Sequence, residues 1–168
     1  MSDVRKDIRR RSKKELRSFF VEHGAPAFHG NQVYEWLWQK AVTDFTQMTN
    51  LSKAHRTLLS EYFSINHTDI AQVQRSNDGT LKNAVRLHDG KVVESVLIPT
   101  ETRSTACVSS QVGCSLDCSF CATAQLKRMR NLNPDEIFDQ VATLNRQSIE
   151  YFNRPLSNIV FMGMGEPM

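Results

Sequence analysis

The sequence lacks any long hydrophobic run. No apolar stretch approaches the roughly 20 residues that a membrane-spanning helix requires. The basic stretch from Met1 to Lys6 is followed by no apolar segment of the kind found in secretory signal peptides, so we expect a cytoplasmic protein. Internal repeats and low-complexity segments are also missing. The 168 residues, 40% of them hydrophobic, suit one folded domain or two small ones.

Cysteine occurs nowhere outside one window of fifteen residues, which contains Cys107, Cys114, Cys118 and Cys121. A secreted disulfide framework would spread its cysteines along the chain, so this clustering excludes that class. In a reducing cytosol such a cluster indicates metal binding or catalysis. Three of the cysteines form a Cys-x3-Cys-x2-Cys run. Iron–sulfur clusters are usually held by four thiolates, so three ligands would leave one iron open to a small molecule.

Acidic residues are scarce near the N-terminus. Residues 4–17 contain eight lysines and arginines against only Asp7 and Glu15. Such a segment is either a solvated helix face or a phosphate-binding patch, and the pattern alone leaves both interpretations open. The net charge of +3 for the whole chain does not by itself indicate a polyanionic partner.

Apolar residues at helical spacing predict three helices within the first 65 residues. The first follows a capping box at Ser12–Glu15 and ends near Gly24. The second covers about residues 30–40, and the third begins near Ser52. Trp36 has the spacing of a core residue, which we favour over a base-stacking role. Residues 1–67 are therefore expected to form a small, basic, all-α domain.

The pattern changes near residue 68 to short strands separated by turn signals. Asp78-Gly79 and Asp89-Gly90 predict type I′ hairpins between strands at about residues 70–75, 80–87 and 91–98. In the last strand Glu94 shares a face with valine and isoleucine. We favour a half-exposed face or a pairing with an arginine such as Arg86. The alternative is a buried carboxylate whose raised pKa suits it to proton transfer.

The remaining residues follow the order strand, loop, helix, strand. A short strand at about residues 106–110 leads into the cysteine loop, and Asn133-Pro134 begins a helix that continues toward Tyr151. Residues 158–162 form a second strand, which the Gly163–Met168 turn follows. This order predicts a βαβ unit with a parallel sheet. Because ligands bind at the carboxyl ends of parallel strands, we expect the cysteine loop and the glycine-rich turn at one edge.

Several motifs carry a resemblance to a known family. Cys114-x3-Cys118-x2-Cys121, with Phe120 before the last cysteine, resembles the radical S-adenosylmethionine (SAM) enzymes. More specific segments resemble the RlmN/Cfr family of adenine methyltransferases: Cys107-Val-Ser-Ser-Gln-Val-Gly-Cys114, Phe120-Cys-Ala-Thr, Arg130-Asn-Leu and Gly163-Met-Gly-Glu-Pro. The N-terminal helices, with Phe28-His-Gly-Asn-Gln-Val33, are similar to the RNA-binding accessory domain of that family.

The resemblance implies an α/β fold preceded by a small all-α domain. Residues 1–67 would form the helical accessory domain, residues 68–100 a β-hairpin extension, and residues 101–168 the first two strands of a truncated, partial TIM-like barrel. A [4Fe–4S] cluster would be held by Cys114, Cys118 and Cys121, with SAM on its open iron. The residues in contact with SAM would be Gly165, Glu166 and Phe120.

The resemblance also implies methylation of adenine C2 in 23S rRNA and tRNA. One SAM would methylate a further cysteine nearer the C-terminus, and a second SAM would be cleaved to a 5′-deoxyadenosyl radical. Glu94 would accept a proton, and Cys107 would resolve the covalent enzyme–RNA adduct through a transient disulfide. An electron donor such as flavodoxin and a monomeric state are also expected.

Two departures from the family pattern stand out. Lys127 occupies a position where relatives commonly have a small residue, and we expect it at the surface or near RNA phosphate. The methyl-carrying cysteine has no counterpart, because all four cysteines match other roles. We therefore interpret the chain as an N-terminal portion of a longer enzyme and predict that it transfers no methyl group by itself.

Three alternatives stay open at this point. The four cysteines could form a structural zinc site in an RNA-binding module, although their gaps do not match the usual paired Cys-x2–4-Cys knuckles. Within the family, the product could be adenine methylated at C8, as by Cfr. A protein that only binds RNA would use the basic helices and leave the cysteines without a role.

Overall fold

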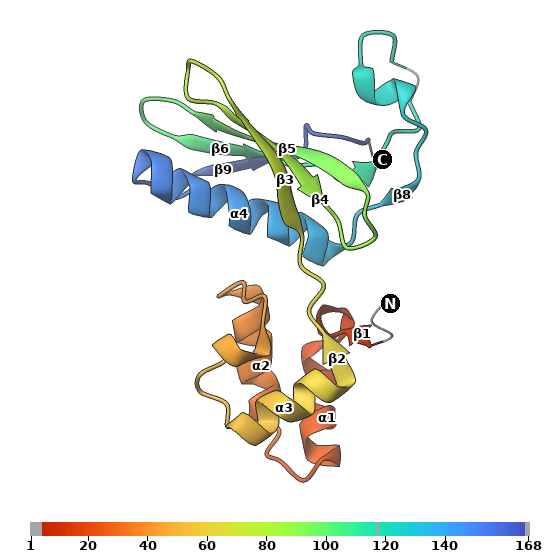
Figure 1. The fold of residues 1–168 in the computed structure, drawn as a ribbon, viewed down its shortest axis with the longest axis vertical. Helices are drawn as coiled ribbons and strands as arrows, with labels where there is room; N and C mark the ends of the chain where they lie inside the picture. The colour runs from red at the N-terminus through yellow and green to blue at the C-terminus, as the bar shows by residue number, and fades with distance from the viewer. Residues whose placement is uncertain (1–4, 117, 167–168) are drawn as a thin grey trace. The chain divides into compact units, whose positions relative to one another are not determined.

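The computed structural model describes residues 5–116 and 118–166. The chain divides between Asn66 and His67 into two compact units. We call them the helical unit and the α/β unit (Figure 1). In the described parts of both units, no helix combines the length and the apolar composition needed to cross a membrane.

The helical unit contains the three expected helices, α1 (Lys13–Glu22), α2 (Phe28–Trp38) and α3 (Lys53–Tyr62). The predicted capping box opens α1, because Ser12 Oγ accepts from Glu15 N (3.2 Å) and Glu15 Oε2 accepts from Ser12 N (2.8 Å). These bonds from Ser12, with Arg11 beside them, lower the pKa of Glu15 to about 2. Gly24 adopts a positive φ just beyond α1, as predicted.

Short elements that the pattern did not predict complete this unit. They are the parallel pair β1 (Lys6–Asp7) and β2 (Phe63–Ser64), and the 3₁₀ helices η1 (Ile8–Arg10) and η2 (Phe45–Gln47).

At the crossing of α1 and α2, a Cβ added to Gly30 would lie 2.4 Å from Arg17 N, so the two backbones need a glycine there. Trp36 is half-buried against the core, as expected.

The α/β unit is built on one five-stranded sheet in the order β3-β4-β5-β6-β9. Its strands are β3 (Asp69–Arg75), β4 (Leu81–Arg86), β5 (Val92–Pro99), β6 (Ser104–Cys107) and β9 (Asn158–Val160). Helix α4 (Pro134–Phe152) lies along one face of this sheet (Figure 1). The core between helix and sheet includes Leu81, Leu97, Ala106, Val108 and Leu144.

Strands β6 and β9 run parallel and are joined through α4, which confirms the predicted βαβ unit. Strand β6 begins and ends earlier than the predicted residues 106–110. After β6, Val108 N still donates to Val160 O at the end of β9, and the N–H groups of Ser110 and Gln111 then donate to Met164 O in the turn after β9. A separate two-stranded ribbon, β7 (Gln111–Val112) with β8 (Arg130–Asn131), flanks the cysteine loop.

Both predicted hairpins form, but the predicted type I′ turns were wrong. Gly79 and Gly90 have positive φ, whereas Asp78 and Asp89 do not. In the first turn Gly79 N donates to Ser76 O (3.0 Å), and the second turn repeats this pattern. The loops are therefore one residue longer than a two-residue I′ turn and place a single glycine in the left-handed region.

Candidate functional site

The cysteine loop is closed at its base by the β7–β8 ribbon. Beyond the ribbon, Cys114 N donates to Leu126 O (3.2 Å), and Cys114 and Lys127 form an isolated bridge. Gly113, with φ of +74°, makes this closure possible: an added Cβ would lie 2.3 Å from Lys127 O. The residues that carry the three-cysteine motif are thus held together as one loop.

All four cysteines are free thiols. Cys114, Cys118 and Cys121 are half-buried, and Cys121 N donates to Cys118 O (3.0 Å). Hydrogen bonds from the backbone of Ala124 and from Thr123 lower the pKa of the Cys121 thiol. Cys107 lies apart from the loop, in β6, where burial raises the pKa of its thiol.

The donor set fits an iron–sulfur cluster in its chemistry. Three unpaired, partly accessible thiols occupy one short loop, and one of them has a lowered pKa, which favours the thiolate that binds metal. Within residues 5–116 and 118–166, no three His, Cys, Asp or Glu side chains already stand close enough to hold a metal ion. Asp117, inside the loop, lies outside the described residues.

The glycine-rich turn after β9 lies against the segment that leads into the cysteine loop. Gly163 N donates to Val108 O (3.1 Å), and Met164 O accepts from the backbone N–H groups of Ser110 (3.0 Å) and Gln111 (3.2 Å). The structure therefore brings the two expected ligand-binding elements to one edge of the sheet, as predicted. Pro167 and Met168 of this turn lie outside the described residues.

Glu94 and Cys107, the two expected catalytic residues, lie on the same face of the sheet. Val96 on β5 pairs with Cys107 on β6. Side chains alternate along a strand, so Glu94 points to the same side as Val96 and Cys107. The two residues are diagonal neighbours across β5 and β6, on the face opposite α4.

The hypothesis of a buried Glu94 was wrong, and so was its pairing with Arg86. The Glu94 side chain is 49% exposed, and its carboxylate pairs with Lys82 Nζ at 2.6 Å. The physical reason is that α4 covers the other face, on which Val93 and Leu97 are fully buried. The favoured half-exposed face is confirmed.

Phe120 and Lys127, two further residues that the sequence singled out, lie at the surface. The Phe120 side chain is 90% exposed, so within the described residues little covers the ring expected to contact SAM. Lys127 is exposed, as expected, and its backbone belongs to the closure of the loop.

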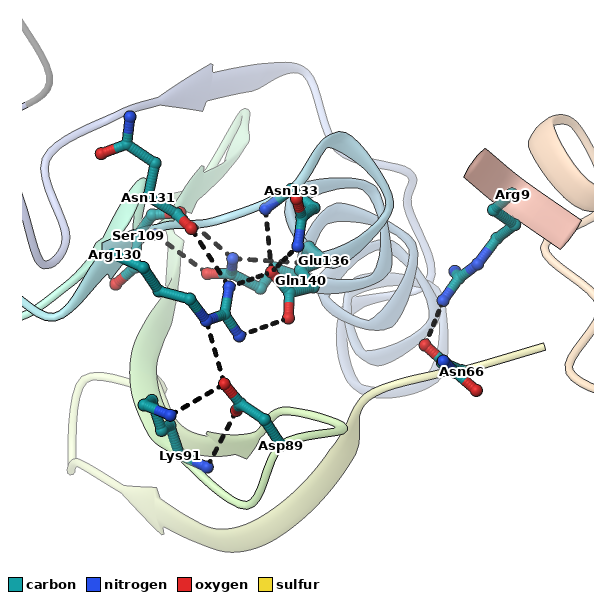
Figure 2. A network of polar contacts seen from close by, with 10 residues as sticks. All are labelled: Arg9, Asn66, Asp89, Lys91, Ser109, Arg130, Asn131, Asn133, Glu136 and Gln140. Carbon is teal, nitrogen blue, oxygen red and sulfur yellow. Dashed lines mark hydrogen bonds and ion pairs between the residues drawn. The ribbon is translucent and has the colours of Figure 1, made fainter. Parts of the chain in front are cut away.

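A network of polar side chains that the sequence pattern did not predict supports this edge (Figure 2). Arg130 bonds to Asp89 and Glu136, and Gln140 bonds to Ser109. Gln140 and Ser109 are fully buried. The sequence contains one indication of this network: Gln140 is a polar residue on the inner face of a helix, between the apolar Ile137 and Leu144.

Comparisons with known proteins agree with this arrangement. Residues 6–65 match the family described as ribosomal RNA large subunit methyltransferase N-terminal domain. The chain is 69% identical, over its whole length, to a probable dual-specificity RNA methyltransferase RlmN of Flavobacterium psychrophilum, of which it covers 48%. It is 43% identical, over 96% of its length, to the dual-specificity RNA methyltransferase RlmN of Desulfotalea psychrophila, of which it covers 46%.

A solved structure is similar in fold as well. The crystal structure of a radical SAM methyltransferase from Sphaerobacter thermophilus matches with a TM-score of 0.82 and 35% sequence identity. The match covers 96% of this chain and 48% of that one. The chain spans about half the length of the curated relatives it matches. The chain is thus similar in sequence to RlmN RNA methyltransferases and in fold to a radical SAM methyltransferase, over about half the length of each.

Proposed function

We propose that this protein methylates C2 of adenine in 23S rRNA and tRNA, with SAM as the methyl source. The observation that carries the proposal is that the Gly163–Glu166 turn packs against residues 108–111, which lead into the three-cysteine loop, after two parallel strands. This is the edge at which α/β proteins bind their ligands. The enzyme would act in the cytoplasm as a monomer and would receive electrons from a donor such as flavodoxin.

Cys114, Cys118 and Cys121 would hold the [4Fe–4S] cluster. When bound, such a cluster supplies the electron for reductive cleavage of SAM. The backbone of Gly165 and Glu166 would bind the amino-acid part of SAM. Gly165 has no side chain to cover the neighbouring peptide groups, and Glu166 is exposed.

Glu94 and Cys107 would act on the RNA base. They share the face of the sheet opposite α4, on which Glu94 is half-exposed and Cys107 is buried, so an adenine lying over β5 and β6 would be next to both. The exposed Glu94 carboxylate can accept a proton there. The raised pKa of Cys107 keeps its thiol protonated at neutral pH, so the proton must leave before the sulfur attacks.

The helical unit would bind the RNA. It carries eleven lysines and arginines against seven aspartates and glutamates, whereas the rest of the chain carries ten against eleven. Exposed Lys13, Lys14 and Arg17 lie together on α1. Phosphate contacts of this kind supply affinity without sequence preference.

The test is complementation in a bacterial strain that lacks its own enzyme of this family. The complete gene that encodes this chain should restore 2-methyladenosine in 23S rRNA and tRNA, measured by mass spectrometry of digested RNA. A Cys118→Ala variant should restore none. Recovery of 8-methyladenosine, or full activity of the variant, would contradict the proposal.

A further inference from the structure

We propose that Ser109 and Gln111 are positioning residues that hold the Gly163–Glu166 turn in the shape that binds SAM. This inference rests on the proposed function, because it gives the turn the same ligand. Neither side chain would touch SAM; each would act through the backbone of the turn.

The Ser109 hydroxyl joins two elements that the proposed reaction uses. It donates to the backbone oxygen of Glu94 (2.5 Å) and accepts from Met164 N (2.8 Å). A hydroxyl has one donor and can accept as well, so both bonds form at once. Since Ser109 is fully buried, water cannot replace either bond. One oxygen therefore fixes the turn relative to the strand that carries the proposed proton acceptor.

Gln140 of α4 holds Ser109 in place (Figure 2). Its Oε1 accepts from Ser109 N (2.9 Å) and its Nε2 donates to Ser109 O (3.1 Å), so one amide satisfies both backbone groups of Ser109. Gln140 is itself fully buried, and Nε2 also reaches Glu136 O (3.3 Å). The serine is thus tied to the helix as well as to β5 and the turn, and a buried network of this kind is rigid.

Gln111 gives the turn its second attachment. Its Oε1 accepts from Glu166 N (3.1 Å), and its Nε2 donates to Asn131 Oδ1 (2.9 Å). Asn131 belongs to β8, at the base of the cysteine loop. Gln111 is 2% exposed. A single buried side chain therefore connects the turn proposed to bind SAM with the strand that leads out of the loop proposed to hold the cluster.

The glycines of the turn match these two residues. A Cβ on Gly163 would lie 2.7 Å from Ser109 Oγ, and a Cβ on Gly165 would lie 2.4 Å from Gln111 Cβ. Gly165 also has a φ of +100°. The glycines thus allow the turn to pack directly on Ser109 and Gln111, which fixes the direction of its peptide groups. Fixed groups bind a ligand more tightly than mobile ones, because less ordering is needed on binding.

The test compares Ser109→Ala and Gln111→Leu with a matched control, Ser95→Ala. Ser95 is a buried serine on β5 whose hydroxyl has no hydrogen-bond partner among the described residues. The product of the complete gene that encodes this chain, unaltered or with one substitution, is reconstituted anaerobically with iron and sulfide. SAM affinity is measured by titration, amide hydrogen exchange of Met164 and Glu166 by NMR, and folding by thermal unfolding.

We expect Ser109→Ala to speed exchange at Met164 and Gln111→Leu to speed exchange at Glu166, each by about tenfold or more. Loss of one hydrogen bond corresponds to SAM binding that is about threefold to tenfold weaker. The control should change neither quantity. A role limited to general stability would lower the unfolding temperature without this pattern of exchange.

Two results would overturn the inference, and they differ in scope. SAM affinity left unchanged by both variants, with the unaltered chain binding SAM, contradicts the inference alone. An unaltered chain that does not bind SAM contradicts the proposed function and the inference together. If Ser109→Ala fails to fold, Gln111→Leu provides the same comparison, because leucine keeps most of the packing of the glutamine side chain.

Discussion

Arg130 connects three separate stretches of the chain through one guanidinium group. Its Nε donates to Asp89 Oδ2 (2.9 Å), and its two terminal nitrogens donate to the Glu136 carboxylate (2.7 and 2.8 Å). Glu136 also accepts from Asn133 N (2.8 Å) at the start of α4. Burial alone would raise the pKa of Glu136, but the bonds from Arg130 and Asn133 outweigh it and hold this pKa below its usual range.

This ion pair makes stability depend on pH in the acidic range. A carboxyl group whose pKa is lower in the folded chain contributes stability that is fully present above its unfolded pKa. That contribution is lost as pH falls through the folded pKa. For Glu136, the free energy of unfolding should therefore fall as pH drops below the ordinary value of 4.5.

Arg130→Met should reduce this pH dependence and cost about 1.5 to 3 kcal/mol at neutral pH, the usual range for hydrogen bonds to charged groups. Urea unfolding at a series of acidic and neutral pH values measures both effects. Arg146→Met is the control, because exposed Arg146 donates to Thr143 Oγ on its own helix. A pH slope equal to that of the unaltered chain would contradict this role of Arg130.

At the residue scale, the strand pattern predicted the face on which Glu94 lies but not the residues around it. Strand alternation correctly grouped Glu94 with Val92, Val96 and Ile98. Both faces of β5 are rich in valine, leucine and isoleucine, so composition could not show which face α4 covers. The roles of Ser109 and Gln111 were not predicted either, because their partners in the turn lie 55 residues further along the chain.

At the scale of elements, the β7–β8 ribbon determines where the cysteine loop begins and ends. Each strand has two residues, and their pairing joins Gln111 to Asn131 and Val112 to Arg130. Such short strands have no periodicity of their own, so the sequence predicted only a loop. The longer helices and hairpins were predictable because their signals, Ser12, Asn133 and the glycines of the turns, lie within the elements themselves.

Gly113→Ala should open this ribbon. The added methyl group would lie 2.3 Å from Lys127 O, at a residue whose φ is +74°. Gly90→Ala is the matched control, because Gly90 has a φ of +80° but open space around it. The control should cost about 1 to 2 kcal/mol for its left-handed backbone alone.

We expect Gly113→Ala to cost at least about 1 kcal/mol more than the control, as overpacking typically does. It should also retain less iron after reconstitution, because the base of the loop no longer closes. Urea unfolding and iron analysis measure the two effects. Equal stability and equal iron content in the two variants would show that the ribbon does not shape the loop.

At the scale of the whole molecule, positive charge is concentrated in one unit. The excess of lysine and arginine lies in the helical unit, and the α/β unit is close to neutral. The sequence showed the basic segment but left its role open. Residues 6–65 match a family described as a ribosomal RNA large subunit methyltransferase N-terminal domain, and under the proposed function the basic segment would bind RNA phosphate.

Changing Lys13, Lys14 and Arg17 together to glutamine should weaken binding to a single-stranded RNA oligonucleotide and make it less sensitive to salt. Each lost phosphate contact lowers the slope of log affinity against log salt by about 0.7, so three contacts lower it by about 2. Fluorescence anisotropy over a series of salt concentrations measures the slope. The control is Arg146→Gln on α4, and a triple variant with the slope of the control would contradict RNA binding by α1.

The identity of the metal centre tests the account most directly. The chain should be reconstituted anaerobically with iron and sulfide and then assayed for bound iron, sulfide and zinc and by electron paramagnetic resonance after reduction. We predict about four irons and four sulfides per chain, the content of a [4Fe–4S] cluster. Cys118→Ala should lose them and Cys107→Ala should keep them, because Cys107 lies in β6 and not in the loop. Stoichiometric zinc that depends on all four cysteines, or a cluster that survives Cys118→Ala, would contradict the account.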